Sequence, residues 1–188
     1  MRKIILASQS PRRQELLRDI VSDFEIIPSN ADETVESDIK ALDVPQYLAL
    51  IKARDISAMH KEDIVIGSDT VVIVDDTVLN KPKSEQDAYR MLRLLSGRKH
   101  IVCTGCAIVC GEKESSFSVV TEVEFYDLSD DEINAYIKTR DCMDKAGAYG
   151  IQSQGKTLVK GIYGDFFNVV GLPVARLKRE LELFVQNL

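Results

Sequence analysis

Residues 3–13 read KIILASQSPRR and carry the signals of a strand followed by a helix. The apolar run over residues 3–7 is typical of a short buried strand. Ser10 then offers a side-chain oxygen for a helix N-cap, and Pro11 suits the first helical position, where a backbone N–H has no intrahelical partner. We therefore predict a strand, a turn and a helix in this order.

The next elements continue this alternation. Residues 24–28 are expected to form a second strand, which leads into the acidic stretch of residues 30–33. A second helix is expected from Val44, because apolar residues then recur at helical spacing. This helix carries Lys52 near the edge of its apolar face, from where a long side chain can extend its ammonium group into a cleft.

The centre of the chain contains its most apolar run. Residues 64–67 read IVIG, which is typical of a strand that is buried on both faces. The polar residues 68–70 are expected to end this strand, and residues 71–74 to resume it. Asp75 and Asp76 follow, and such residues favour a tight turn. We therefore predict an interrupted strand and then a hairpin.

Antiparallel strands become more frequent in the second half of the chain. The elements expected there are a helix capped at Ser84, paired strands over residues 101–110 and 117–126, a helix capped at Ser129, a glycine-rich segment from Gly147 to Gly164, a strand over residues 166–170, and a helix with Val174, Leu177, Leu181 and Val185 on its inner face. This order favours an α/β fold with an elongated mixed β-sheet flanked by helices.

Composition and charge narrow the class of protein. The 188 residues are 45% hydrophobic and 29% charged, which fits one globular domain over residues 1–188. The net charge of −6 disfavours nucleic acids and anionic membranes as partners, because proteins that bind them usually carry a basic excess. The first apolar run is too short for a signal peptide, and no run is long enough to span a membrane. We therefore expect a cytoplasmic protein.

Histidine and cysteine offer little for chemistry. His60 and His100 are the only histidines, and neither is near a second candidate ligand in the sequence. Three of the four cysteines share the predicted strand over residues 101–110, whereas a zinc site needs a second ligand pair at matching spacing. We interpret all of these residues as structural. The common P-loop, G-x-G-x-x-G and G-x-S-x-G motifs are also absent from the sequence.

The first turn is a candidate phosphate site. Ser8, Ser10, Arg12 and Arg13 lie at a predicted strand end and in the first turn of a helix, where unpaired N–H groups and the helix dipole favour an anion. Arginine at a helix N-terminus opposes the dipole by about 0.3–1 kcal/mol unless a bound anion offsets this. Bidentate arginine contacts suit phosphate oxygens. The alternative is that both arginines are simply solvated.

Asp69 is the strongest candidate for a catalytic group. It follows the predicted central strand, and open α/β sheets bind ligands outside the carboxyl ends of their strands. A carboxylate there can ligate a divalent cation or orient and deprotonate water, although it can also be a plain turn residue. Glu33, Lys52 and Lys81 are weak candidates when taken singly, because such residues are more often solvated charges, and they gain value only as a group. Lys81 follows the predicted hairpin and can return to the same cleft as a charge for phosphate.

Several motifs together resemble one protein family. They are LASQSPRR (residues 6–13), GSDT (67–70), KP (81–82), LSG (95–97), DKAGAYGIQ (144–152) and VGLP (170–173). In this order and spacing they resemble the Maf family of nucleoside triphosphate pyrophosphatases, nearly from end to end. The resemblance implies a sheet with a central cleft, similar to that of the inosine triphosphate pyrophosphatases. It also implies a divalent metal cation, Mg²⁺ or Mn²⁺, and a homodimer.

The resemblance assigns roles to individual residues. Asp69 matches the proton acceptor of the family. The substrate-specificity positions are matched by Arg12, Thr70 and Gln152, and the positions that handle phosphate and metal are matched by Ser10, Arg13, Glu33, Lys52 and Lys81. We expect Glu33 and Asp69 to hold the metal, and Ser8, Ser10, Arg12, Arg13, Lys52 and Lys81 to bind phosphate.

The substrate preference follows from the end of the DKAGAYGIQ motif. This ending resembles that of the family branch that acts on dTTP and UTP, and CTP and modified pyrimidine triphosphates are further candidate substrates. Gln152 has both a donor and an acceptor with which to read a pyrimidine edge. Ser68 and Ser153 depart from the family pattern, which more often has Ala and Gly there. Ser153 is expected to stiffen the loop that holds Gln152, because a residue with a Cβ adopts positive φ far less readily than Gly.

Two other functions use similar parts. A nucleotidyltransferase also places a basic loop after its first strand and uses a carboxylate-bound metal, but such loops usually contain Gly and residues 8–13 contain none. A nucleotide-sensing protein in cell division control is the second alternative, although capture alone does not require a carboxylate aimed at a metal. We expect hydrolysis of dTTP and UTP to the monophosphate and pyrophosphate, with Asp69 as the base.

Overall fold

The structure is a computed structural model that describes residues 2–188. The strands are β1 (Ile4–Leu6), β2 (Glu25–Ile26), β3 (Ile64–Val74), β4 (Thr77–Leu79), β5 (Lys99–Cys110), β6 (Lys113–Phe125) and β7 (Val159–Tyr163). The α-helices are α1 (Pro11–Arg18), α2 (Val44–Ser57), α3 (Glu85–Leu95), α4 (Asp130–Lys138), α5 (Phe166–Val170) and α6 (Val174–Gln186). Two short 3₁₀ helices are η1 (Ala146–Ala148) and η2 (Gln154–Leu158).

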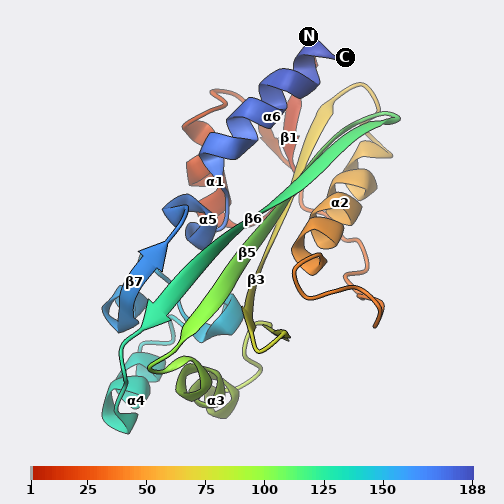
Figure 1. Cartoon of the computed structure of the whole chain (residues 1–188). Helices are drawn as coiled ribbons and strands as arrows, with labels where there is room; N and C mark the ends of the chain where they lie inside the picture. The colour runs from red at the N-terminus through yellow and green to blue at the C-terminus, as the bar shows by residue number, and fades with distance from the viewer. Residues whose placement is uncertain (1) are drawn as a thin grey trace. The chain divides into compact units, whose positions relative to one another are not determined.

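The strands form one seven-stranded sheet in the order β2-β1-β3-β5-β6-β7, with β4 paired to β3 (Figure 1). β1 is parallel to β2 and β3, whereas the β3–β4 and β6–β7 pairs are antiparallel. The predicted α/β fold with a mixed sheet and flanking helices is therefore confirmed. Within residues 2–188, no helix combines the length and the apolar character that a membrane crossing requires.

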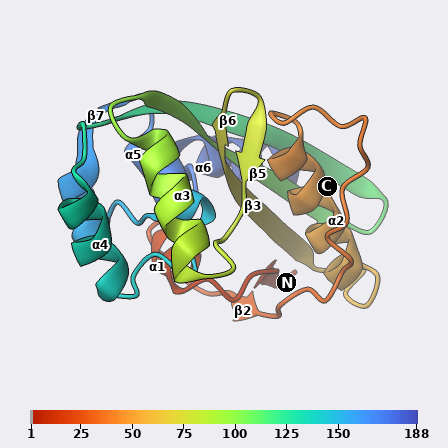
Figure 2. The same cartoon turned by 90° about the horizontal axis from the view of Figure 1, so that it is seen from below.

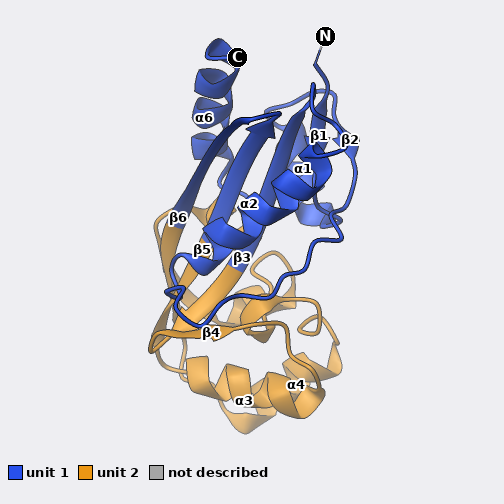
Figure 3. Ribbon diagram, turned by 90° about the vertical axis from the view of Figure 1, so that its right-hand side faces the viewer, with its two compact units in different colours: residues 1–70, 104–119, 171–188 blue, residues 71–103, 120–170 orange. Residues whose placement is uncertain are grey.

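The chain is divided into two compact units (Figure 3). Unit 1 contains residues 1–70, 104–119 and 171–188, and unit 2 contains residues 71–103 and 120–170. Strands β3, β5 and β6 each contribute residues to both units. The prediction of one domain did not include this subdivision.

Unit 1 contains an unusually close contact between α2 and the sheet. A Cβ atom on Gly67 of β3 would lie 2.1 Å from the carbonyl oxygen of Ala49, and one on Gly105 of β5 would lie 2.2 Å from the carbonyl carbon of Pro45. Glycine at both positions lets the helix backbone approach the two strands (Figure 1). Small side chains continue this contact, since Ala49 and Ala53 are fully buried in the core of this unit.

Unit 2 has a core of its own, to which α3 and α4 contribute side by side (Figure 2). Three aromatic rings pack edge to face within it. The ring centroids of Phe125 and Tyr149 are 4.7 Å apart, and those of His100 and Phe125 are 5.0 Å apart. His100 Nε2 and the Tyr149 hydroxyl lie at hydrogen-bond distance, 2.8 Å. The interpretation of His100 as a structural residue agrees with this position.

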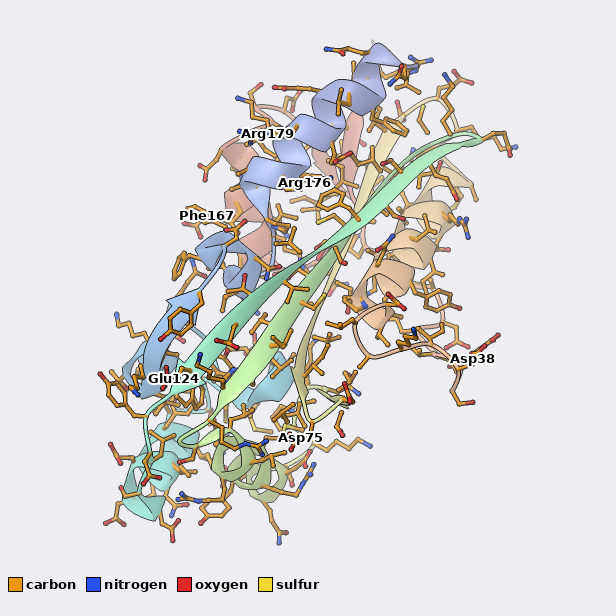
Figure 4. The ribbon with its side chains drawn as sticks, viewed as in Figure 1. Asp38, Asp75, Glu124, Phe167, Arg176 and Arg179 are labelled. Carbon is orange, nitrogen blue, oxygen red and sulfur yellow. The ribbon has the colours of Figure 1, made fainter. Side chains whose placement is uncertain are left out.

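Local signals in the sequence placed most element boundaries correctly. Ser10, Ser84 and Ser129 are N-caps of α1, α3 and α4, and each side chain accepts a hydrogen bond from a backbone N–H in the first turn. Asp75 and Asp76 form the predicted hairpin turn with φ of 49° and 57°, a left-handed conformation that Asp tolerates in tight turns. Figure 4 labels Asp75 at the tip of this β3–β4 hairpin.

The predicted interruption of the central strand is wrong, because β3 continues without a break through residues 68–70. The polar side chains are accommodated in the strand because they have partners. The Ser68 hydroxyl donates to the carbonyl of Gly171 at 3.3 Å, and the hydroxyls of Thr70 and Thr104 are 2.9 Å apart. Asp69 therefore lies inside a strand and not at its carboxyl end.

Two predictions near the end of the chain are also wrong. Residues 166–170 form a helix and not a strand, because the Asp165 carboxylate accepts hydrogen bonds from the backbone N–H groups of Phe167 and Asn168 and so caps a helical turn. The strand of this region is β7, inside the predicted glycine-rich segment. In α6 the larger Phe184 takes the buried position, and Val185 is 49% exposed.

His100 makes the stability of the protein depend on pH. Burial lowers the pKa of His100 to about 4 from its ordinary 6.5, so the unfolded chain takes up this proton more readily than the folded chain. The resulting stabilisation is complete above pH 6.5 and is lost as the pH falls from 6.5 towards 4, by roughly 3 kcal/mol in total. We expect urea unfolding of the wild type and of His100→Gln to show a stability difference that shrinks between pH 7 and pH 4.5. Parallel pH profiles of the two proteins would contradict this account.

Candidate functional site

The register between β1 and β3 brings the first turn to the polar part of β3. The two strands pair in parallel with Leu6 opposite Ile66, and the Ala7 N–H donates to the Ile66 carbonyl at 2.8 Å. β1 ends at Leu6 while β3 continues, so the turn that follows β1 lies beside residues 68–70. Two motifs that are about 60 residues apart in the sequence thus meet in unit 1.

Side chains alternate along β3, so its polar residues point to opposite faces. Gly67 and Asp69 face α2, as the contact of Gly67 with Ala49 and the contact of Asp69 with Lys52 indicate. Ser68 and Thr70 face the other side. Each face of β3 therefore carries its own group of polar contacts.

Lys52 of α2 joins the two predicted metal ligands. Its ammonium nitrogen is 2.7 Å from Asp69 Oδ1 and 3.1 Å from Glu33 Oε2. The side chains of Lys52 and Asp69 are only 12% and 14% exposed, whereas that of Glu33 is 55% exposed. The structure thus brings these three predicted site residues together, with one positive charge between two carboxylates.

Arg13 is the centre of the contacts on the opposite face. Its Nε donates to the Gly171 carbonyl at 2.9 Å, and its two terminal nitrogens donate to the hydroxyls of Ser8 at 3.3 Å and Thr70 at 3.0 Å. Burial lowers the pKa of the Arg13 guanidinium, while the charge of Asp69 acts in the opposite direction. Gly171 has a φ of 126°, a conformation that favours glycine at this position. Arg13 therefore links α1, β3 and the segment before α6.

The two serines of the first turn order its backbone. The Ser10 hydroxyl accepts from the Arg13 N–H at 3.5 Å, and the Ser10 N–H donates to the Ser8 hydroxyl at 3.3 Å. Arg12 lies next to Arg13 in the first turn of α1 and is partly exposed. The predicted phosphate-binding residues of this turn thus occupy one ordered segment.

Two residues that contact the predicted site residues could not be identified as such from the sequence. The Thr104 hydroxyl lies at hydrogen-bond distance from the Thr70 hydroxyl, and the Gly171 carbonyl accepts hydrogen bonds from both Ser68 and Arg13. Gly171 belongs to the VGLP motif, which carried a signal but no assigned role. The thiol of Cys106 also contacts Ser68, at 3.9 Å, but burial raises its pKa to about 12, so it is not a nucleophile.

The donor set of unit 1 fits a divalent cation only in part. Among residues 2–188, no three His, Cys, Asp or Glu side chains are placed to hold a metal ion. Glu33 and Asp69 nevertheless offer two carboxylates that share a single ammonium group. Mg²⁺ typically binds through one or two carboxylates together with substrate phosphates, and this pair fits that requirement.

Lys81 and Gln152 belong to unit 2. Lys81 is exposed in the segment that follows β4, and Gln152 is exposed in the turn between η1 and η2.

The predicted reason for a stiff loop at Ser153 is wrong, because Ser153 has a φ of −104° and needs no left-handed conformation. Its hydroxyl instead donates to the carboxylate of Asp141.

Comparison with known proteins extends these observations. The family described as Maf-like protein matches residues 3–184. A protein of Carboxydothermus hydrogenoformans named dTTP/UTP pyrophosphatase is 52% identical over 181 residues, which cover 95% of this chain and 97% of that protein. A protein of the same name from Bacillus mycoides is 48% identical over 184 residues, which cover 98% of this chain and 96% of that protein. The solved Ham1 protein of Staphylococcus aureus has a similar fold, with a TM-score of 0.59, 14% identity, and coverage of 96% and 98% of the two chains.

The contacts of Arg13 predict that lysine cannot replace it. A single ammonium group cannot reach all three acceptors that the guanidinium contacts, so Arg13→Lys loses hydrogen bonds that link α1, β3 and the segment before α6. We expect a loss of about 1–3 kcal/mol in the free energy of unfolding, measured by urea denaturation. Arg18→Lys, an exposed substitution in the same helix, is the control and is expected to change stability by less than about 0.5 kcal/mol. Equal denaturation midpoints for both variants would show that the Arg13 contacts do not support the fold.

Proposed function

The chain belongs to the Maf family, and from this premise we propose that it is an enzyme that hydrolyses nucleoside triphosphates to the monophosphate and pyrophosphate. Its curated relatives are named for this reaction and match over almost their whole length, which supports the proposal. The observation in this chain that carries it is the contact of Lys52 with Asp69 and Glu33, beside the turn that holds Arg13.

We propose that dTTP and UTP are the preferred substrates, with CTP and modified pyrimidine triphosphates as further candidates. The names of the relatives support the first two. Gln152 is the proposed reader of the base, because its amide offers one donor and one acceptor to a pyrimidine edge. Arg12 and Thr70 are the other proposed specificity residues. Thr70 is held in one orientation by Arg13 and Thr104.

Asp69 is the proposed general base. Its carboxylate accepts a proton from the attacking water, and the bond that breaks joins the α and β phosphates. The Lys52 ammonium group donates a hydrogen bond to Asp69 Oδ1 at 2.7 Å. We propose that a bound triphosphate attracts the Lys52 ammonium to its oxygens, which frees Asp69 for water. Ser8, Ser10, Arg12, Arg13 and Lys81 are the other proposed phosphate-binding residues.

Glu33 and Asp69 are the proposed holders of a divalent cation, Mg²⁺ or Mn²⁺. Carboxylate oxygens are the ligands that Mg²⁺ prefers, and the phosphates of a bound substrate would add further oxygen ligands to those of Glu33 and Asp69. A cation bound there supplies neutralisation of the phosphate charges and polarises the phosphoryl group. The cytoplasmic location, the homodimer and the lack of a nucleic acid or membrane partner stay predictions.

Asp69→Asn tests the base. The amide keeps the size of the side chain but cannot take up the proton, so we expect turnover of dTTP with Mg²⁺ to fall by about 10²–10⁴-fold while nucleotide binding is retained. Release of pyrophosphate and monophosphate from a panel of triphosphates measures turnover, and calorimetry measures binding. Asp38→Asn makes the same change on the exposed loop before α2 (Figure 4) and is expected to leave turnover unchanged. Normal turnover by Asp69→Asn would reject the proposed base.

Gln152→Ala tests the base reader. Removal of the amide is expected to reduce the preference for dTTP over dGTP, measured as the ratio of kcat/KM, by about tenfold, with little change in kcat for dTTP. Gln154→Ala, an exposed glutamine two residues further on, is the matched control. An unchanged substrate profile in Gln152→Ala would exclude Gln152 from base recognition.

A further inference from the structure

Gln152 lies on a loop that is anchored on both sides. On one side the Gly150 N–H donates to the hydroxyl of Tyr136 in α4 at 3.1 Å. On the other side the Ser153 hydroxyl donates to the Asp141 carboxylate and lies 3.2 Å from the Gly150 carbonyl. Gln152 itself is exposed. All of these residues belong to unit 2.

Asp141 connects the two anchors. The Tyr136 hydroxyl donates to its Oδ2 at 2.9 Å, and the ammonium group of Lys145 lies 3.0 Å from its Oδ1. Burial acts to raise the pKa of Asp141, but the hydrogen bonds from Ser153, Lys145 and Tyr136 outweigh this and leave the pKa below its ordinary value. The carboxylate therefore stays ionised at neutral pH and keeps accepting all three donors.

The loop has little room to move between these anchors. A Cβ atom on Gly150 would lie 2.4 Å from Lys145 Cε and 2.9 Å from Ser153 Oγ. One on Gly155 would lie 2.7 Å from the Gly150 carbonyl oxygen and 2.9 Å from the Tyr136 hydroxyl. Tyr136 is 5% exposed, so this packing includes part of the core of unit 2. The backbone on both sides of Gln152 is thus fixed by contacts that do not involve the Gln152 side chain.

We propose that Ser153, Asp141 and Tyr136 are positioning residues that set the base selectivity of the enzyme by holding the loop of Gln152. This inference rests on the proposed function, in which Gln152 reads the base. The three residues act through Gln152 and not on the reacting phosphates. Their loss should therefore affect how well one base is preferred over another and leave the rate of the chemical step largely intact.

Ser153→Ala is the most direct test, because it removes one hydroxyl from a partly exposed position and leaves the backbone conformation accessible. We expect the ratio of kcat/KM for dTTP over dGTP to fall about five- to tenfold, through KM, with kcat for dTTP within about twofold of the wild type. Hydrogen exchange of the backbone amides over residues 150–153 should become faster. Ser153→Thr keeps the hydroxyl, so we expect its selectivity for dTTP over dGTP and its hydrogen exchange over residues 150–153 to match those of the wild type.

Thr157→Ala is the matched control. The Thr157 hydroxyl also donates one hydrogen bond in this segment, at 2.9 Å to the Gln154 carbonyl, but it is not among the described donors to Asp141. It should leave selectivity and exchange unchanged. Tyr136→Phe removes the other anchor and should lower selectivity in the same way as Ser153→Ala.

Three outcomes would overturn the inference. The first is unchanged selectivity and exchange in Ser153→Ala. The second is an equal fall in kcat for dTTP and dGTP, which is the result of general structural damage. The third is that the wild type itself hydrolyses none of the triphosphates. This result refutes the proposed function as well, and it differs from the first two outcomes because it is seen without any substitution.

Discussion

The close approach of α2 to the sheet is the constraint on which the rest of unit 1 depends. The helix backbone meets β3 at Gly67 and β5 at Gly105, where any side chain would overlap it. A helix held at this distance has little freedom to slide along the strands, and Lys52 consequently lies opposite Asp69. The ion pair therefore follows from backbone packing. Because the packing already restricts both side chains, less conformational entropy is lost when the pair forms, and this helps to offset the desolvation of two largely buried charges.

A carboxylate in the middle of a strand is held more rigidly than one on a loop, and this bears directly on the chemistry proposed for Asp69. Side-chain alternation sends Asp69 to the α2 face and Thr70 to the opposite face, where its hydroxyl contacts Arg13 and Thr104. Both faces of the strand at this point are thus engaged in contacts. Movement of the Asp69 backbone would disrupt the Arg13 contacts and the glycine packing together. General base catalysis benefits from such fixed geometry, because proton transfer requires the water and the base to stay within hydrogen-bond distance.

Most elements of the fold could be predicted because their signals are local. An N-cap serine or a turn with two aspartates depends on residues within one turn of helix or hairpin. The error in the central strand arose where distant residues decide the outcome. Ser68 and Thr70 were expected to interrupt a strand, since polar residues favour turns, but their partners Gly171 and Thr104 lie far away in the sequence. The same limit applies to the site, because its residues were identified by motif while the contacts that orient them come from the fold.

Ser153 shows how the contacts of the fold can replace the physical cause that the sequence suggested. A stiff loop was expected because a Cβ disfavours positive φ, yet Ser153 has an ordinary φ, and its hydroxyl bonds to Asp141 instead. Without that hydroxyl the described donors of Asp141 would be Tyr136 and Lys145, and the loop would keep only its anchor at Gly150. A single side-chain oxygen thus adds a second fixed point next to Gln152. Selectivity can therefore vary through residues that never contact the base, because they change the freedom of the residue that does.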